Sequence, residues 1–128
     1  MAKKHFICTH TWVSPEARVE FLKMTSDITD REFFESVKTE RAETLRHWMG
    51  KEDFFYCHWF AEDEDAIFDA LEGIGGNDFM ATLPIETERY VDSSDIKDQT
   101  LINPYDDYRL ENWLWREFVK SIRGHLRK

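Results

Sequence analysis

The chain has 128 residues, of which 41% are hydrophobic and 15% aromatic, and it carries a formal net charge of −9 at pH 7. This length and apolar content predict one folded domain with a sizeable core, and they exclude a chain that is disordered throughout. The acidic balance argues against general nucleic-acid binding, because phosphates attract basic surfaces.

The first residues and the cysteine count indicate a compartment. The opening MAKKHFICTHTWV lacks an apolar core of signal-peptide length, and no apolar run in the chain approaches a membrane span. Two cysteines, Cys8 and Cys57, are too few for a disulfide framework, and neither lies in a Cys-x-x-Cys motif. We therefore expect a cytoplasmic protein with reduced thiols and no membrane partner.

The first quarter of the chain predicts a strand followed by a helix. Residues 4–13, KHFICTHTWV, have the β-branched and aromatic enrichment of a strand. Ser14 and Pro15 then have the pattern of a helix start, with Ser14 as N-cap and Pro15 at the first helical position. The expected buried stripe of this helix is Val19, Phe21, Leu22 and Met24.

A second short helix and a β-hairpin are predicted next. Thr29 and Glu32 have the spacing of a capping box, which predicts a helix from Asp30 to about Thr39. Residues 45–49 and 54–60 are strand-like, and residues 50–53, GKED, form the turn between them. The expected inward residues of the helix are Phe33, Phe34 and Val37.

The second hairpin strand, FFYCHWF, has no charged residue to mark a solvent face. Because successive side chains of a strand point to opposite faces, two sets of residues face opposite ways. One set is Phe54, Tyr56, His58 and Phe60, and the other is Phe55, Cys57 and Trp59. Both faces of the sheet therefore need a cover that excludes water.

The next segment completes an α+β pattern. Residues 63–71, DEDAIFDAL, predict a third helix with acidic residues in its first turn, and residues 80–91 predict a fourth strand. Pro84 favours an edge position for that strand or a bulge within it. The order strand, helix, strand, strand, helix, strand predicts a ferredoxin-like βαββαβ fold, with a four-stranded antiparallel sheet and helices on one face. The expected inward residues of the third helix are Ala66, Ile67, Ala70 and Leu71.

The C-terminal part differs in composition and charge. Residues 1–97 contain 11 Lys or Arg and 21 Asp or Glu, whereas residues 109–128 contain 6 and 2. We expect a domain at 1–92, followed at 93–128 by a connecting segment and an amphipathic helix that starts near Tyr108 and packs on the domain or on a second copy. Its aromatic residues are candidates for a dimer interface: Trp113, Trp115 and Phe118.

Residues 42–71, AETLRHWMGKEDFFYCHWFAEDEDAIFDAL, resemble a family of uncharacterised bacterial proteins of the dimeric α+β barrel class, which includes a nickel-binding member. The shared features are the pair His47 and Trp48, the aromatic-Tyr-Cys run at 55–57, and the acidic helix start at 61–66. The resemblance covers about residues 4–92. It implies a homodimer in which each copy covers the open sheet face of the other. Relatives include cofactor-free monooxygenases, dehalogenating enzymes, haem-degrading enzymes and proteins without known activity, so the fold alone selects no function.

The histidines are the candidate metal ligands. If the hairpin turn centres on residues 51–52, His47 pairs with Tyr56, and His47 and His58 become diagonal neighbours on one face. His10 joins them if the same side of its strand faces that way. Such a set could bind nickel or zinc, and the alternative is that these rings only make hydrogen bonds at the rim of a core or interface.

A pocket between the helices and the sheet is the other candidate site. His10, His47, Tyr56 and His58 could orient a small apolar or aromatic molecule there without any cofactor. A His or Tyr acting as acid–base group would support a monooxygenase-like reaction. The third hypothesis is a structural homodimer without catalytic activity. No motif in the sequence decides between these functions.

Overall fold

The computed structural model describes residues 2–99 and a helix at 113–126, and within that helix it describes the side chains of residues 118–124. The contacts divide the chain into two units, Met1–Thr87 and Glu88–Lys128. The candidate sites lie in the first unit.

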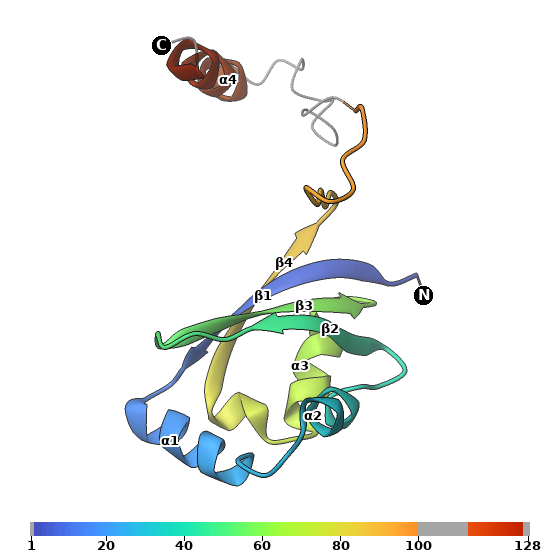
Figure 1. The fold of residues 1–128 in the computed structure, drawn as a ribbon, viewed down its shortest axis with the longest axis vertical. Helices are drawn as coiled ribbons and strands as arrows, with labels where there is room; N and C mark the ends of the chain where they lie inside the picture. The colour runs from blue at the N-terminus through green and yellow to red at the C-terminus, as the bar shows by residue number, and fades with distance from the viewer. Residues whose placement is uncertain (1, 100–112, 127–128) are drawn as a thin grey trace. The chain divides into compact units, whose positions relative to one another are not determined.

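Figure 1 shows the helices and strands of the first unit. Its elements are β1 (Lys4–Trp12), α1 (Pro15–Met24), α2 (Asp30–Ser36), β2 (Ala42–Trp48), β3 (Phe54–Ala61), α3 (Glu64–Glu72), the 3-10 turn η1 (Gly76–Asp78) and β4 (Met80–Thr87).

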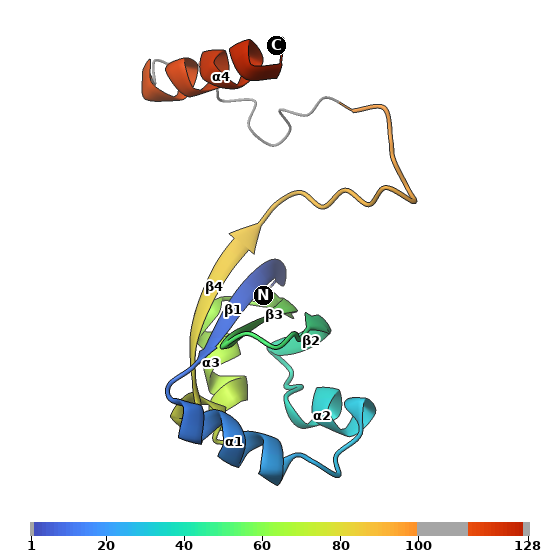
Figure 2. The same cartoon turned by 60° about the vertical axis from the view of Figure 1, so that its left-hand side comes forward.

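The four strands form one antiparallel sheet in the order β2-β3-β1-β4. Helices α1, α2 and α3 all lie on one side of this sheet, as the two views in Figures 1 and 2 agree. The predicted α+β fold with a four-stranded antiparallel sheet is thus confirmed, and the arrangement is compatible with a ferredoxin-like fold. β4 is an edge strand, as Pro84 predicted.

Each of the three helices begins at a capping side chain that accepts a backbone hydrogen bond. Ser14 Oγ accepts from the Ala17 N–H at 3.0 Å, and Pro15 follows it at the first helical position. Thr29 caps α2 and Asp63 caps α3 in the same way, at 3.1 and 2.8 Å. Because these groups satisfy otherwise unpaired donors, each cap stabilises its helix by about 1 kcal/mol.

Helix α2 ends at Ser36, three residues before the predicted end at Thr39. The Thr39 hydroxyl accepts hydrogen bonds from the N–H groups of Arg41 and Ala42, both at 3.1 Å. The Thr39 N–H donates to the Ala42 carbonyl at 2.8 Å. These bonds turn the chain into β2, so a local side-chain contact competes successfully with helix propagation.

The core lies between the sheet and the helices. The strands contribute their helix-facing residues Phe6, Cys8, His10, Trp12, Phe55, Cys57, Trp59 and Ala61. Helix α3 contributes all four predicted inward residues, Ala66, Ile67, Ala70 and Leu71. Each large apolar side chain buried here contributes about 2 kcal/mol of transfer free energy.

The buried stripe predicted for α1 is largely wrong. Only Ala17 and Phe21 are buried, whereas Val19, Leu22 and Met24 are exposed. Ala17 and Phe21 are four residues apart and therefore lie on one line along the helix, while Val19 lies about 200° round from Ala17. The helix packs mainly through Phe21, whose ring contacts Trp12, Phe33 and Phe79.

The predicted hairpin register is also wrong. The observed pairs are Arg46 with His58, His47 with Cys57 and Trp48 with Tyr56, with a register shift between Thr44 and Arg46. The extra residue, Leu45, is a bulge, and the connection after Trp48 has five residues, so the two strands meet one step away from the expected register. A one-residue slip moves every side chain of a strand to the other face.

The fourth strand ends at Thr87 rather than near residue 91. Thr87 pairs with His5, and only Lys4 of β1 lies beyond this pair, so a strand that continued to residue 91 would extend past the start of β1. In the second unit, α4 (Trp113–Leu126) lies within the segment for which a helix was predicted. Its expected start near Tyr108 and the side chains of Trp113 and Trp115 lie outside the described residues, and Phe118 is exposed. Within the described residues, no helix combines the length and apolar character needed to cross a membrane.

Candidate functional site

The four predicted site residues lie on two different faces of the sheet. His10 and His47 point to the helix-covered side, since they are level with the buried residues Phe55 and Cys57. Tyr56 and His58 point to the opposite side, which we call the open face. The expected convergence of His47 and His58 is therefore wrong, because the bulge in β2 changes the face of His47.

The same separation bears on the metal hypothesis. His10, His47 and His58 do not share one face, and the part of the chain that the structure describes contains no group of three or more His, Cys, Asp or Glu side chains arranged as a ligand set. Nickel or zinc binding stays a prediction from the resemblance, and elemental analysis of the purified protein tests it.

On the helix-covered side, a cavity of about 170 Å³ lies between α1, α2 and the adjoining ends of β2 and β3. We call it the α1–α2 pocket. Its wall is formed by Phe21, Leu22, Thr25, Ile28, Thr29, Asp30, Phe33, His47, Met49 and Phe55. The wall is mainly apolar and includes a few polar groups, which is the usual composition of a small-molecule site.

The two hydroxyl groups of the α1–α2 pocket already have hydrogen-bond partners. Thr25 Oγ1 donates to the Phe21 carbonyl at 2.9 Å. Thr29 Oγ1 accepts from the Glu32 N–H and bonds the Glu32 carboxylate, both at 3.1 Å. These hydroxyls are part of the ends of α1 and α2, so they stabilise the wall and are not spare donors for a ligand.

His47 differs from those hydroxyls because its Nδ1 atom is buried and has no hydrogen-bond partner. The imidazole packs at 6.2 Å from the Phe33 ring and edge-on at 5.1 Å from the Phe34 ring, measured between centroids. A buried polar atom without a partner costs about 1–3 kcal/mol, and such an atom in a native structure needs an explanation. A ligand or water that enters the pocket could supply the missing partner.

His10 is a buried core residue that contacts Thr82 and Phe55. It is 1% exposed, its Nδ1 lies 2.8 Å from Thr82 Oγ1, and its ring stacks on Phe55 with 4.8 Å between centroids. Burial lowers the pKa of His10 to about 4, so the ring is neutral at pH 7. His10 does not line the α1–α2 pocket, but it supports Phe55, which does.

On the open face, His58 lies in a chain of hydrogen bonds across three strands. Arg46 Nη1 lies 2.9 Å from His58 Nδ1, and His58 Nε2 lies 2.8 Å from His5 Nδ1. His58 is only 9% exposed, and its pKa is lowered by burial, by His5 and by Arg46.

The sequence reasoning missed both His5 and Arg46. His5 shares its face with Ile7, which pairs with His58, so strand alternation alone could have placed His5 near His58. Arg46 could not be placed in that way, because its pairing with His58 depends on the Leu45 bulge.

The open face around Arg46, His58 and His5 is apolar and partly exposed. Tyr56 lies opposite the half-exposed Trp48, while Leu83 and Ile85 of β4 are 60% and 53% exposed. Ile85 pairs with Ile7, which continues the apolar surface onto β1. Tyr56 is therefore part of a wide surface rather than of an enclosed pocket with His10 and His47.

The two cysteines are direct partners across β1 and β3, and both are free and buried. Burial raises the pKa of Cys8 and of Cys57 to about 12. A thiol needs to ionise to act as a nucleophile or a redox group, so this pair has the properties of small core residues.

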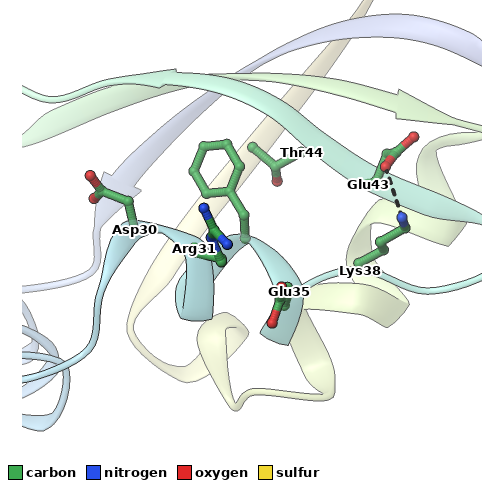
Figure 3. Close-up of a pocket in the computed structure, with 7 residues that line it drawn as sticks. Asp30, Arg31, Glu35, Lys38, Glu43 and Thr44 are labelled. Carbon is green, nitrogen blue, oxygen red and sulfur yellow. Dashed lines mark ion pairs between the residues drawn. The ribbon is translucent and has the colours of Figure 1, made fainter.

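A second cavity, of about 370 Å³, lies between α2 and β2 (Figure 3). Its lining is Asp30, Arg31, Phe34, Glu35, Lys38, Glu43 and Thr44. Lys38 and Glu43 form an ion pair at 3.6 Å across one end. The lining carries charges of both signs, so it favours neither an apolar molecule nor an ion of one sign. The α1–α2 pocket is therefore the better candidate for an apolar ligand.

No protein-family model, curated protein sequence or solved structure matches this chain in comparisons with known proteins. The resemblance to the dimeric α+β barrel class therefore stays a prediction, and the functional argument rests on the geometry of the two faces.

Proposed function

We propose that the protein binds a small, largely apolar molecule with one hydrogen-bonding group in the α1–α2 pocket. The observation that carries the proposal is the buried Nδ1 of His47, which lacks a hydrogen-bond partner in a wall made mainly of aromatic and aliphatic side chains. A ligand with a hydroxyl or carbonyl group would satisfy this nitrogen, while its apolar part would contact Phe21, Phe33 and Phe55.

The size of the pocket narrows the ligand class. The cavity of about 170 Å³ is smaller than the roughly 300 Å³ at which drug-sized sites begin, and an apolar cavity of roughly 150 Å³ accommodates a benzene ring. The best fit is therefore a single substituted ring, such as a phenol, rather than a polycyclic substrate.

The monooxygenase-like reaction implied by the resemblance is a further step. In this pocket His47 is the side chain suited to accept a proton from a phenolic ligand, because its Nδ1 has no competing hydrogen bond. We therefore place the acid–base role on His47 alone, with Tyr56 and His58 assigned to the opposite face.

A calorimetric or NMR titration with phenol and toluene tests the binding proposal. The wild-type protein should bind phenol at least about fivefold more tightly than toluene, since one hydrogen bond contributes about 1 kcal/mol or more in a buried site. His47→Phe should keep toluene binding and remove the preference for phenol. The matched control, Tyr56→Phe, removes a hydroxyl on the open face and should leave the preference unchanged. Absence of binding by either compound, or a preference that persists in His47→Phe, contradicts the proposal.

We also propose that two copies associate through their open faces, as ferredoxin-like protomers of a dimeric α+β barrel. The proposal is supported by the exposed apolar residues Trp48, Leu83 and Ile85 on a face that α1, α2 and α3 do not cover. A standard interface buries roughly 800 Å² per partner, which is within reach of one face of a four-stranded sheet. A twofold contact places the same surface on both copies, so an apolar surface is complementary to itself. A contribution of Trp113, Trp115 and Phe118 to this interface stays a prediction, and a dimer of this kind without catalysis remains the third hypothesis.

A further inference from the structure

The hydrogen bonds of Arg46, His58 and His5 have a direction that the donor chemistry fixes. A guanidinium group can only donate, so His58 Nδ1 must accept from Arg46. In a neutral imidazole the other nitrogen then carries the proton, so His58 Nε2 donates to His5 Nδ1. Both hydrogen bonds can exist together only while both histidines are neutral.

A single added proton breaks this arrangement wherever it binds. A proton on His58 Nδ1 would face the N–H of Arg46, and that hydrogen bond would be lost. A proton on His5 Nδ1 would face the N–H of His58 Nε2. The contact between the two rings would then survive only if the His58 proton moved to Nδ1, against Arg46. One of the two hydrogen bonds is lost in every case.

The surroundings of His58 reinforce this sensitivity. The groups that face it are His5 from β1, Arg46 from β2 and Tyr56 from its own strand. Phe60 is two residues from His58 along β3, and the Lys3 ammonium lies 5.9 Å from the centroid of the Phe60 ring. Glu43 pairs with Phe60 across the sheet and forms an ion pair with Lys38. Among the described residues no carboxylate forms an ion pair with His5 or His58. Burial, followed by His5 and Arg46, lowers the pKa of His58, so this ring takes up a proton at a lower pH than an exposed histidine does.

We propose that the Arg46–His58–His5 chain is a proton-sensitive switch that weakens the association of two copies through their open faces as the pH falls. The inference rests on the association proposed above. Two facing copies would bury this chain, and a proton would leave an imidazolium beside a guanidinium that has lost a hydrogen bond. A buried charge without a partner opposes association, whereas in a single copy water can solvate it.

Sedimentation of the full chain at a series of pH values tests the switch. Association should weaken by about tenfold as the pH falls from about 7.5 to about 5 for each unit by which association further lowers the pKa of His58. The double variant His5→Gln, His58→Gln keeps groups that donate and accept but cannot take up a proton, and it should associate equally across this range. The control His47→Gln removes a histidine from the other face and should behave as the wild type. Circular dichroism at each pH establishes that every variant stays folded.

The possible results separate this inference from the association on which it rests. Association that is equally strong at both ends of the pH range overturns the switch and leaves the association intact. A protein that is monomeric at every pH contradicts the association itself and the switch with it. ¹⁵N NMR of the imidazole rings gives a second readout, and at neutral pH both rings should carry the proton on Nε2. A proton on Nδ1 of neutral His58 would overturn the hydrogen-bond direction and hence the switch.

Discussion

The two faces of the sheet carry similar residues, but these residues differ in burial and in hydrogen-bond partners. On the helix-covered face, aromatic residues such as Trp59 are fully buried, and the one buried histidine of β1, His10, has a single hydroxyl partner. On the open face, Trp48 is half-exposed, and His58 is shielded by a histidine and an arginine from the neighbouring strands. The aromatic pattern of residues 54–60 predicts that both faces of the sheet exclude water. Because α1, α2 and α3 cover only one face, the pattern of the other face calls for a different cover.

Two tryptophans give the largest expected contrast between the faces. Trp59→Ala should lower the free energy of unfolding by about 3–5 kcal/mol, because Trp59 is 1% exposed and its removal leaves a cavity in the core. Trp48→Ala, at 51% exposure, should cost about 1 kcal/mol or less in dilute protein. Urea denaturation below the association range measures both. Equal losses would mean that the open face is as well packed in one copy as the core.

The pH dependence of unfolding should expose the buried histidine. Burial lowers the pKa of His10 from its ordinary 6.5 to about 4, so between these values the unfolded state binds more protons than the folded state. Stability should therefore fall as the pH falls from about 6.5 to 4, by up to about 3 kcal/mol from this group. His10→Asn retains a group that can bond Thr82 and cannot titrate in this range. This variant should lose less stability between pH 6.5 and pH 4 than the wild type does. An identical dependence of stability on pH would contradict the role given to His10.

The helix caps and the two faces differ in how far the sequence could predict them. Ser14, Thr29 and Asp63 act within three residues of themselves, so a local pattern suffices to place the helix starts. The alternation of residues 54–60 likewise predicts which side chains share a face, and the burial of Phe55, Cys57 and Trp59 agrees.

The site depended on features that are not local. The bulge at Leu45 has no marked sequence signal, yet it moves His47 to the helix-covered face and places Arg46 beside His58. The α1–α2 pocket arises where Phe21, Phe33 and His47 meet from three separate elements, and their spacing in the chain does not encode that meeting. The four predicted site residues, His10, His47, Tyr56 and His58, were therefore wrongly combined into one constellation, since they lie on two faces of the sheet.

A cap substitution gives a smaller effect and tests whether α1 is a stable part of the covered face. Ser14→Ala removes the acceptor for the Ala17 N–H and should reduce the free energy of unfolding by about 1 kcal/mol. Ser14→Asp restores a good cap and serves as the matched control, so its stability should lie close to that of the wild type. A loss as large as that of Trp59→Ala would show that more than the cap is disturbed.

The most direct test of the account is the oligomeric state of the wild-type protein and of Ile85→Lys at neutral pH, measured by sedimentation equilibrium at micromolar concentration. Ile85 is 53% exposed on the open face, so a lysine there should leave the fold intact and place a charge within the proposed contact. The account predicts a dimer for the wild type and a folded monomer for Ile85→Lys. A monomeric wild type, or a variant that dimerises as strongly as the wild type, would contradict the claim that a second copy covers the open face.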